Sequence, residues 1–560
     1  MLKFTERPFV KENLKIYKIG RTGLNNEQTN NFMEDCIMVK NMGALNYNTY
    51  EDAVKNYNPS EKWLVFDGKP EKFNIAHECI DRHVDRGVAI KVKFSDGSTE
   101  SYTFMELSRF SSQFANMLKS LDIYRGDSIA VFLEPSLEFY VSFFGGLKAG
   151  TPLVICSPLL GFEALKYRLQ DSKAKLIIVD RGINDVWSSH VRKVIFKDEL
   201  MDAVKRESDK FEYSTSVYDV AVIQYTSGAT GLPKPIVYRH KSLVSLAPVS
   251  RFAYGIKNDD VFFCPSAVAW GHFVWGGTCG PLMFGVPTCT RSGKFDVERI
   301  CEALEEFKVT NITMAPTAYR KVVEFKEFGK YDIWVKRLTY TGEYMDLETF
   351  HKVRERFGRD PCCLYGSTEV GVIIADYAGF NDWRVKPGSL GKPMLGLEVA
   401  VIDENDKPLP PNTIGDIAVK LGGRWVRVGD SGLMDDDGYF WYKGRIDDVI
   451  KSSGYRIGPE EVESILNMHE AVLESAVIGV PDKNRGQIVK AFIKLKPGYE
   501  PSEKLKEEIK LFVKERLSKY SYPRDMEFID EIPKTIDGKI RRKELRMREM
   551  ERMKAEVKNC

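Results

Sequence analysis

The sequence predicts an α/β protein with a large N-terminal domain and a small α+β domain at its C-terminus. Strand-like and helix-like stretches alternate through the first half of the chain, and a second mixed region begins near residue 450. Two strand-like runs lie between these regions, near residues 400 and 417. The length of 560 residues also exceeds that of most single domains. We therefore expect helix-covered, mainly parallel sheets in the large domain, together with a small β subdomain.

The alternation of elements becomes regular from residue 102 onward. Short apolar runs have the length of buried strands, and the longer stretches between them have helical spacing. Because strand–helix–strand repeats join parallel strands, helices should cover the faces of the sheet. We expect helices over 50–57, 73–83, 104–121, 137–149, 164–170 and from 270, strands over 128–132, 151–155, 175–179, 220–224 and 311–315, and a strand that runs into a turn over 337–344.

The last part of the chain has a pattern of its own. Pro459 is followed by two acidic residues, which is typical of the first turn of a helix. Apolar residues between 502 and 520 recur on one face of a predicted amphipathic helix. Strands are expected over 474–479 and 489–495 in this part, and over 398–403 and 414–420 in the β subdomain.

Charge and composition exclude several classes of protein. The formal net charge is only +2, so no strong field favours binding of nucleic acid. The best apolar stretch is interrupted by Glu134 and Glu138, so we expect no transmembrane segment. The first residues contain no apolar signal core. Ten cysteines without a C-x-x-C pair are typical of reduced thiols, which favours a cytoplasmic location.

Motifs of other enzyme classes are missing from the sequence. It contains neither H-E-x-x-H nor G-x-S-x-G, and no two glycines are spaced for G-x-G-x-x-G. His77 and His83 lie on one predicted helix, but a histidine pair without further partners is more often structural than metal-binding.

One stretch stands out, Tyr-Thr-Ser-Gly-Ala-Thr-Gly-Leu-Pro-Lys-Pro at residues 225–235. It follows a short apolar strand, and its glycines allow a tight turn that presents N–H groups and hydroxyls. Such a loop, with the fixed cation of Lys234, suits a polyphosphate. It is not a Walker A loop, because no G-K-[S/T] follows at the required spacing. Taken alone, a flexible connector rich in Gly, Ser and Thr explains the composition equally well.

Five further motifs follow in order at residues 365–371, 429–430, 444–448, 453–458 and 533–539. They read Tyr-Gly-Ser-Thr-Glu-Val-Gly, Gly-Asp, Gly-Arg-Ile-Asp-Asp, Ser-Gly-Tyr-Arg-Ile-Gly and Pro-Lys-Thr-Ile-Asp-Gly-Lys. With these six motifs the chain resembles the adenylate-forming superfamily of acyl- and aryl-CoA synthetases, peptide-synthetase adenylation domains and firefly-type luciferases. Over residues 63–545 it is most similar to acetyl- and medium-chain acyl-CoA synthetases.

The resemblance implies the residues of a nucleotide site. Glu369 would hold Mg²⁺ through a carboxylate oxygen, and Asp430 would accept both ribose hydroxyls. Lys539, Thr226, Glu369 and His272 would be the catalytic residues, with His272 near the reacting carboxylate. The implied ATP and AMP contacts are Thr226, Ser227, Gly228, Thr230, Gly231, Lys234, Gly342, Glu343, Tyr344, Tyr365, Thr368, Asp430, Arg445, Arg456 and Lys539.

The resemblance also implies an acyl site, a CoA site and a hinge. Gly366 replaces a tryptophan that closes the short pocket of acetyl-CoA synthetases, so its missing side chain predicts room for longer acids. The acyl pocket would contain Trp270, Phe273, Val274, Trp275 and Gly366, and the backbone at Ser452, Ser453, Gly454 and Tyr455 would meet CoA. Asp447 would be the hinge about which a mobile small domain rotates. The implied boundaries are an N-terminal extension at 1–60, a large domain at 61–444, a hinge at 445–449 and a small domain at 450–560.

The function implied is that of an acyl-CoA synthetase, which uses ATP, Mg²⁺ and CoA. The expected substrate is a medium-chain, branched or small aryl carboxylic acid. Three alternatives stay open: an adenylation enzyme that loads a separate carrier-protein thiol, a luciferase-like oxygenase and a catalytically silent nucleotide binder. Assembly into a homo-oligomer is also compatible with the sequence.

Overall fold

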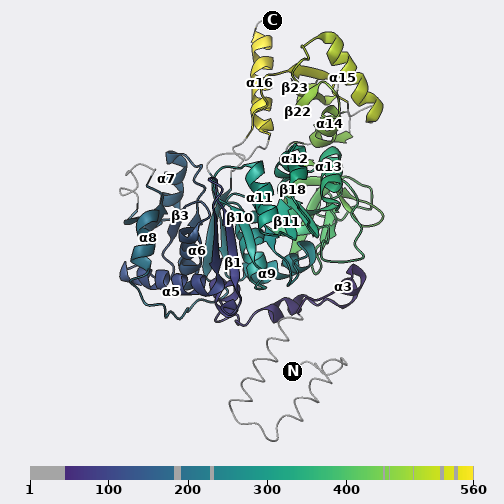
Figure 1. Cartoon of the computed structure of the whole chain (residues 1–560). Helices are drawn as coiled ribbons and strands as arrows, with labels where there is room; N and C mark the ends of the chain where they lie inside the picture. Colours follow the sequence, from purple (N-terminus) through teal and green to yellow (C-terminus); the bar gives the residue numbers. More distant parts are fainter. Residues whose placement is uncertain are drawn as a thin grey trace.

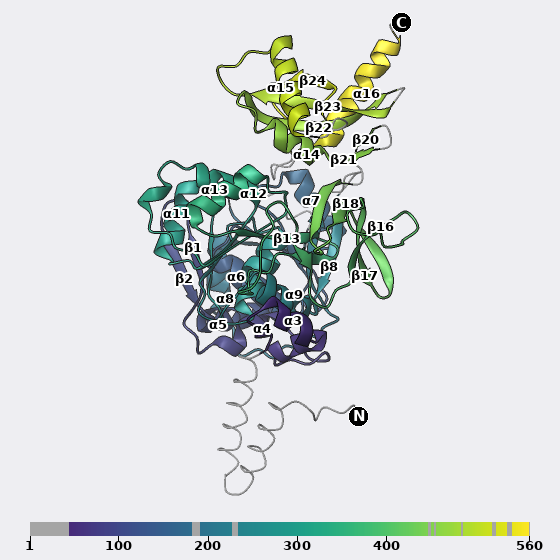
Figure 2. The ribbon, with the colours of Figure 1, turned by 90° about the vertical axis from the view of Figure 1, so that its right-hand side faces the viewer.

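The computed structural model describes residues 44–181, 191–226, 233–445, 448, 450–452, 455–482, 485–517, 522–534 and 540–558. Within these residues the chain forms a large domain and a small unit at one end of it, as the sequence predicts (Figure 1). The small unit carries helices α14 (Pro459–Leu466), α15 (Glu503–Arg516) and α16 (Arg542–Lys558). Figure 2 shows the same arrangement from the side, with these helices again beyond the large domain.

The first sheet of the large domain has the strand order β6-β5-β3-β4-β7-β8. Its strands are parallel except for the antiparallel pair β7–β8, and β3 and β5 are buried along their whole length. Continuous burial is typical of strands covered on both faces. The elements are β3 (Ile129–Phe132), β4 (Leu153–Ile155), β5 (Leu176–Val179), β6 (Lys193–Phe196), β7 (Val220–Thr226) and β8 (Lys234–Arg239), with α5 (Phe104–Ser120), α6 (Leu137–Ala149), α7 (Phe162–Asp171) and α8 (Lys197–Val204).

The second sheet has nine strands in the order β15-β14-β13-β12-β11-β9-β10-β1-β2. Its central strands are parallel, whereas β2, β14 and β15 pair in antiparallel fashion. The strands are β1 (Val88–Lys93), β2 (Thr99–Thr103), β9 (Phe262–Phe263), β10 (Thr288–Arg291), β11 (Asn311–Met314), β12 (Arg337–Thr341), β13 (Pro361–Ser367), β14 (Gly371–Ala375) and β15 (Lys392–Pro393). The helices are α9 (Ser242–Pro248), η4 (Val249–Ala253), η5 (His272–Cys279), α10 (Gly280–Leu282), α11 (Val297–Glu306), α12 (Pro316–Glu324), η6 (Phe328–Lys330) and α13 (Leu347–Phe357).

Two smaller sheets complete the fold. The β subdomain is an antiparallel sheet of β16 (Val399–Ile402), β17 (Gly415–Leu421), β18 (Arg424–Met434) and β19 (Phe440–Arg445). The small unit has a five-stranded sheet of β20 (Ile450–Ser452), β21 (Tyr455–Ile457), β22 (Val472–Asp482), β23 (Gly486–Leu495) and β24 (Asp525–Phe528). Strand β19 ends where the predicted hinge begins, so the β subdomain leads directly into the small unit.

The described end of the predicted N-terminal extension packs against the large domain. Tyr50 in α3 (Tyr50–Asn56) lies 5.0 Å from Tyr377 and 4.9 Å from Trp383 between ring centroids. Its backbone N–H donates to Asp382 at 2.6 Å. Aromatic pairs of this kind contribute about 0.5–1.5 kcal/mol beyond the burial of their area. Residues from 44 onward are therefore part of the large domain, and Ala53 of α3 and Val65 of η1 (Pro59–Val65) are buried in its core.

Two predicted helices differ from expectation. The helix expected over 73–83 is α4 (Ile75–Cys79) followed by the separate turn η2 (Asp81–His83), because Ile80 leaves helical geometry at φ −125° and ψ −60°. The segment expected to be an ordinary helix from residue 270 is the π-helix η5. A π-helix places side chains at a different angular spacing from an α-helix and is frequent at functional sites.

Candidate functional site

The predicted phosphate loop joins the antiparallel strands β7 and β8. Thr226 at the end of β7 pairs with Lys234 at the start of β8. Because β7 is parallel to β4, this end of the hairpin lies at the carboxyl edge of the first sheet, where α/β proteins bind ligands. Lys234 is exposed there. Ser227, Gly228, Thr230, Gly231 and the side chain of Thr226 lie outside the described residues.

The second motif forms the hairpin between β13 and β14. The backbone carbonyl of Thr368 accepts a hydrogen bond from the Tyr238 hydroxyl at 2.7 Å. Tyr238 lies on β8, so this bond ties the phosphate-loop hairpin of the first sheet to the motif hairpin of the second. Burial and the charge of Glu369 raise the pKa of Tyr238, which keeps its hydroxyl a donor. Glu369 is exposed at the tip of the hairpin, as a ligand for Mg²⁺ would require.

Gly366 has a different role from the one predicted. A Cβ at this position would lie 1.8 Å from the carbonyl oxygen of Gly371 and 2.9 Å from the Cα of Val372. The missing side chain therefore permits close approach of the two strands of the hairpin and does not leave an indole-sized space. The prediction that Gly366 opens the acyl pocket is wrong for this physical reason.

Asp430 is fixed by two neighbours. The Tyr365 hydroxyl donates to Asp430 Oδ2 at 2.7 Å, and Arg445 Nε lies 3.3 Å from Oδ1. Asp430 and Arg445 are also directly opposite each other in the β18–β19 pair. Burial and the adjacent carboxylate raise the pKa of Tyr365, so it stays a hydrogen-bond donor. The fold thus joins three predicted nucleotide contacts into one group.

The turn after β12 carries the residues predicted to line the adenine slot. Glu343 Oε2 accepts from the hydroxyl and the N–H of Thr317, at 2.6 and 3.2 Å, at the start of α12. The ring of Tyr344 stacks on Tyr442 at 6.2 Å between centroids. A Cβ on Gly342 would lie 4.0 Å from the Trp270 ring, so the expected adenine and acyl segments adjoin.

His272 has both ring nitrogens engaged by hydroxyl groups. Nδ1 lies 2.9 Å from Ser266 Oγ, and Nε2 lies 2.7 Å from Thr313 Oγ1. Burial lowers the pKa of His272 to about 4, so the ring is neutral near pH 7. A neutral ring can orient a substrate through hydrogen bonds, but it supplies no positive charge to a carboxylate.

The predicted acyl residues divide between the site and the core. Trp275 packs against Tyr238 at 5.0 Å between ring centroids, next to the nucleotide motifs. Phe273 instead packs against Phe139 of α6 at 5.8 Å and is 2% exposed, and Val274 is 1% exposed in the same core. Of the four side chains predicted for the pocket, only the two tryptophans lie beside other site residues.

The small unit begins with a β-hairpin. Ser452 on β20 pairs with Tyr455 on β21 and is buried. Ser453, Gly454, Asp447, Lys539 and the side chains of Tyr455 and Arg456 lie outside the described residues. An antiparallel bridge pairs Lys534 with Ile540, on either side of the segment that contains Lys539.

A cluster of charges begins within the predicted hinge, at Asp448, and continues into the small unit. Arg542 lies 2.6 Å from Glu463, 3.1 Å from Glu460 and 3.7 Å from Asp448, and Arg546 lies 2.5 Å from Asp448. Burial raises the pKa of Glu460 to about 7 despite the attraction of Arg542. The small unit is therefore bound together by ion pairs from Asp448 onward.

Several residues of this site were not predicted from the sequence. Tyr238, Thr317, Tyr442, Ser266 and Thr313 hold predicted site residues in place, but each stands outside the six motifs. Tyr238 is more buried than its neighbours on β8, but that burial is a property of the structure and offered no signal in the sequence.

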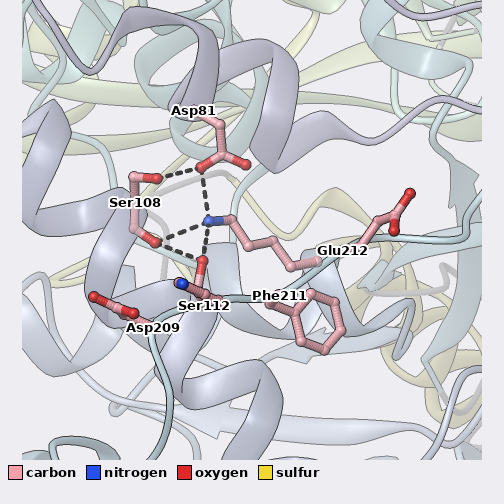
Figure 3. A pocket seen from close by; sticks show the side chains of 8 residues that line it. Asp81, Ser108, Ser112, Asp209, Phe211 and Glu212 are labelled. Atoms are coloured by element: carbon pink, nitrogen blue, oxygen red, sulfur yellow. Dashed lines mark hydrogen bonds and ion pairs between the residues drawn. The ribbon is translucent and has the colours of Figure 1, made fainter.

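A separate pocket of about 560 Å³ lies between α5, α6, η2 and residues 209–212 (Figure 3). Lys148 Nζ contacts Asp81 at 2.7 Å, the Ser112 hydroxyl at 2.8 Å and the Ser108 carbonyl at 2.9 Å. These three contacts use all three donors of the ammonium group. The pocket is lined by Asp81, Ser108, Ser112, Lys148, Asp209, Lys210, Phe211 and Glu212, and none of these is a predicted site residue.

The described residues contain no group of three or more His, Cys, Asp or Glu side chains placed to share a metal ion. A single carboxylate such as Glu369 nevertheless fits Mg²⁺, which keeps several waters and binds largely through substrate phosphates. Across the same residues, no helix is both long and apolar enough to cross a membrane.

A two-sheet large domain, a β subdomain and a small C-terminal unit, with glycine-rich hairpins meeting between the sheets, define an adenylate-forming enzyme. The sequence profile of the AMP-binding enzyme family matches residues 78–426, and that of the AMP-binding enzyme C-terminal domain matches residues 461–539. The chain therefore belongs to the AMP-binding enzyme family, and within it to the acyl-CoA synthetases.

Three relatives illustrate this membership. Acetyl-coenzyme A synthetase of Bacillus subtilis is 33% identical, over 91% of this chain and 96% of the relative. Mitochondrial acyl-coenzyme A synthetase ACSM3 of Mus musculus is 34% identical, over 86% and 91%. The 4-hydroxybutyrate–CoA ligase 1 of Metallosphaera sedula is 33% identical, over 86% and 92%.

Solved structures agree with this fold. The anthranilate CoA ligase AuaEII, in complex with anthranoyl-AMP, matches with a TM-score of 0.78 and 28% identity, over 88% of this chain and 98% of that one. The acyl-CoA synthetase of Brucella canis matches with a TM-score of 0.71 and 31% identity, over 90% of this chain and 100% of that one.

Proposed function

We propose that the protein activates a carboxylic acid with ATP and transfers the acyl group to CoA. The observation that carries this proposal is the hydrogen bond from Tyr238 to the Thr368 carbonyl. It brings the phosphate-loop hairpin beside the hairpin of Tyr365 and Glu369, and Tyr365 in turn fixes Asp430. A triphosphate, a metal ion and a ribose can therefore be bound by one continuous group of residues.

In the first half-reaction a carboxylate oxygen attacks the α-phosphorus of ATP. The bond from that phosphorus to the bridging oxygen breaks, and acyl-AMP and pyrophosphate form. No strong base is required, because a carboxylic acid is already ionised near pH 7. The main barrier is repulsion between two anions, which Lys234 and Lys539 would reduce by placing fixed cations near the phosphates. Mg²⁺ held by Glu369 would supply further charge neutralisation.

In the second half-reaction the CoA sulfur attacks the acyl carbon of the adenylate. The carbon–oxygen bond to AMP breaks, and the thioester and AMP form. The nucleophile is the thiolate, from a thiol with a pKa near 8.5, and the adenylate is a good leaving group. We propose that Ser452, Ser453, Gly454 and Tyr455 guide CoA to this position after the small unit rotates about Asp447.

The substrate proposed from the sequence is a medium-chain, branched or small aryl acid. Gly366 does not support that range, because the hairpin requires a residue without a side chain at this position. The named substrates of the relatives differ as well, from acetate and 4-hydroxybutyrate to anthranilate. What remains in favour of a larger acid is the apolar surface of Trp270 and Trp275 beside the nucleotide motifs. A cytoplasmic location and a possible homo-oligomer stay predictions.

A screen of pyrophosphate release tests the proposal. Acids from acetate through branched and medium chains to benzoate are incubated with ATP and Mg²⁺, with and without CoA. Acyl-CoA formed as soon as CoA is present supports the proposal. Acyl-AMP that accumulates until a carrier protein is added supports a carrier-loading enzyme, and oxygen consumption supports an oxygenase. No pyrophosphate with any acid would indicate a silent nucleotide binder.

A further inference from the structure

Tyr238 lies where three parts of the proposed reaction site meet. It belongs to β8, the strand that begins at Lys234 of the phosphate loop. Its hydroxyl donates to the Thr368 carbonyl at 2.7 Å, in the hairpin that carries Glu369. Its ring packs against Trp275 of η5 at 5.0 Å between centroids. Tyr238 stands outside all six motifs, so these contacts alone indicate what it does.

The hairpin between β13 and β14 is fixed by strand pairing up to its last pair, Ser367 with Gly371. Next to that pair the two backbones are in close contact, because a Cβ on Gly366 would lie 1.8 Å from the Gly371 carbonyl oxygen. Residues 368–370 form the turn beyond the pair. Glu369 is exposed in the middle of this turn, so strand pairing does not fix it.

The hydrogen bond from Tyr238 acts on the turn itself. The Thr368 carbonyl belongs to the peptide unit that joins Thr368 to Glu369, and the six atoms of a peptide unit lie close to one plane. Fixing the direction of the carbonyl therefore fixes the plane that ends at the Glu369 Cα. Mg²⁺ demands near-ideal octahedral geometry, so a carboxylate that is directed in advance loses less conformational freedom when it binds the metal.

Tyr238 can hold this carbonyl because its own position is fixed from two sides. Its backbone pairs with Val222 on β7. Its side chain is half-buried between the exposed Val237 and Arg239, since alternate side chains of a strand point to opposite faces. The contact with the Trp275 ring then restricts rotation of the phenol. The donor is therefore set by the first sheet and by η5, and the acceptor lies in the second sheet.

We infer that Tyr238 is a positioning residue for Mg²⁺, whose hydroxyl directs Glu369 before the metal binds with ATP. The inference rests on the proposed acyl-CoA synthetase function, in which Glu369 is the metal ligand. Tyr238 needs no contact with the metal, because it acts through the peptide unit between Thr368 and Glu369. Without the hydroxyl the turn must be ordered as the metal binds, so Mg²⁺ binding should weaken about 3- to 10-fold, the equivalent of one hydrogen bond.

Titration of Mg²⁺ tests the inference on the full-length enzyme saturated with a non-hydrolysable ATP analogue. Calorimetry gives the Kd for free Mg²⁺. Tyr238→Phe removes the hydroxyl and keeps the ring against Trp275. It should raise this Kd about 3- to 10-fold and leave the KM for the carboxylic acid within about twofold.

Tyr439→Phe is the matched control, because the Tyr439 hydroxyl also donates to a backbone carbonyl, that of Arg384 at 2.6 Å. The control should leave the Kd for Mg²⁺ unchanged. An unchanged Kd in folded Tyr238→Phe, or an equal increase in Tyr439→Phe, would overturn the inference.

A double-mutant cycle tests whether Tyr238 acts through Glu369. Glu369→Gln removes the negative charge and keeps the size of the side chain. If Tyr238 acts by directing that carboxylate, adding Tyr238→Phe to Glu369→Gln should change the Kd for Mg²⁺ by less than about twofold. A full effect of Tyr238→Phe in the Glu369→Gln background contradicts the inference.

The inference and the proposed function fail in different ways. If the wild type forms thioesters, but the Mg²⁺ titrations of Tyr238→Phe and the wild type coincide, the positioning role is wrong and the synthetase function stands. If the wild type shows neither Mg²⁺-dependent nucleotide binding nor pyrophosphate release with any acid, the synthetase function fails and the positioning role fails with it.

Discussion

At the scale of single residues, burial decides the charge of the histidines around the large domain's core. His240 is fully buried, and its Nδ1 accepts a hydrogen bond from the Ile75 N–H at 3.0 Å. Burial lowers the pKa of His240 to about 4, and lowers that of His272 to about 4 as well. These rings stay neutral in the folded protein under conditions in which an unfolded chain would begin to protonate them.

This difference predicts a loss of stability in acid. The ordinary pKa of histidine is near 6.5, so the unfolded chain binds a proton below that pH, while folded His240 does not until about pH 4. The contribution of His240 to the free energy of unfolding is on the order of 3 kcal/mol. It is present above pH 6.5 and is lost as the pH falls toward 4. His240→Asn keeps an acceptor for Ile75 and should flatten the dependence of the unfolding free energy on pH between 7.5 and 5.

Urea unfolding at several pH values, followed by tryptophan fluorescence, measures that slope. His351→Asn is the control, because His351 is exposed on α13. A slope that is as steep in His240→Asn as in the wild type would show that His240 does not contribute to acid sensitivity.

Tyr365 is a second residue whose role can be tested alone, through its hydroxyl group. Its 2.7 Å hydrogen bond holds Asp430, the predicted ribose ligand, in place. Tyr365→Phe should raise the KM for ATP roughly 3- to 10-fold, the equivalent of one hydrogen bond, and leave the KM for the acid nearly unchanged. Tyr319→Phe is the matched control, since its hydroxyl bonds the Thr339 carbonyl inside the core. Equal changes in both KM values for Tyr365→Phe would contradict a ribose-side role.

At the scale of elements, the site is formed by the two hairpins β7–β8 and β13–β14. The shape of the second hairpin depends on the close approach of its two backbone strands. Its strands meet at Gly366, whose absent side chain lets the Gly371 carbonyl approach. The π-helix η5 then places His272 toward Ser266 and Thr313, and Phe273 toward the core. The direction of each side chain is thus a property of the element that carries it.

Substitution at Gly366 should therefore disturb the hairpin and not the choice of acid. Gly366→Ala places a methyl group against the Gly371 carbonyl oxygen, so the hairpin must open. We expect activity to fall at least tenfold with all acids, and kcat/KM for acetate relative to hexanoate to stay within about twofold. Gly329→Ala is the control, because a Cβ there meets nothing within 4 Å among the described residues. A selective loss of hexanoate would restore the pocket role of Gly366.

The hinge is the second element with a testable role. Asp448 is held by Arg546 and Arg542, so the rigid part of the small unit begins one residue after Asp447. Asp447→Pro fixes φ near −65° and should trap one arrangement of the small unit. Pyrophosphate exchange should continue while acyl transfer to CoA falls at least a hundredfold, and Asp447→Ala should retain both. Thioester formed from acyl-AMP at the wild-type rate in Asp447→Pro would remove this residue from the hinge.

At the scale of the whole molecule, the two proposed half-reactions predict two positions of the small unit. Lys539 lies within the segment flanked by the paired residues Lys534 and Ile540. Lys539 would meet the phosphates in one position, and the backbone near Ser452 would meet CoA in the other. Since both groups are expected to reach the same nucleotide, we expect the small unit to rotate between the two half-reactions.

The variant Lys539→Ala should distinguish the two half-reactions. Loss of one preorganised charge contact at a reacting phosphate lowers the rate by about 10²–10³, so acyl-AMP formation should fall by that factor. Thioester formation from synthetic acyl-AMP and CoA should remain near the wild-type rate. Lys534→Ala is the control, because Lys534 pairs with Glu474 at 2.5 Å. An equal loss in both half-reactions for Lys539→Ala would contradict a role confined to the first.

Local pattern alone determined the class of fold, most element positions and the family. The strand expected over 220–224 is β7, the helix over 137–149 is α6, and the helix from Pro459 is α14, because hydrophobic period and capping residues act within a few positions of the chain. The six motifs identified the family for a similar reason, since each motif is local.

Contacts between distant segments were decided only by the tertiary structure. Tyr238 and Thr368 are 130 positions apart, and His272 and Thr313 are 41 apart, so no sequence pattern joins them. The sequence interpreted Gly366 as empty volume, whereas strand pairing fills that volume with the Gly371 carbonyl. The sequence specifies the type of each side chain, but tertiary packing determines the partners on which its chemistry depends.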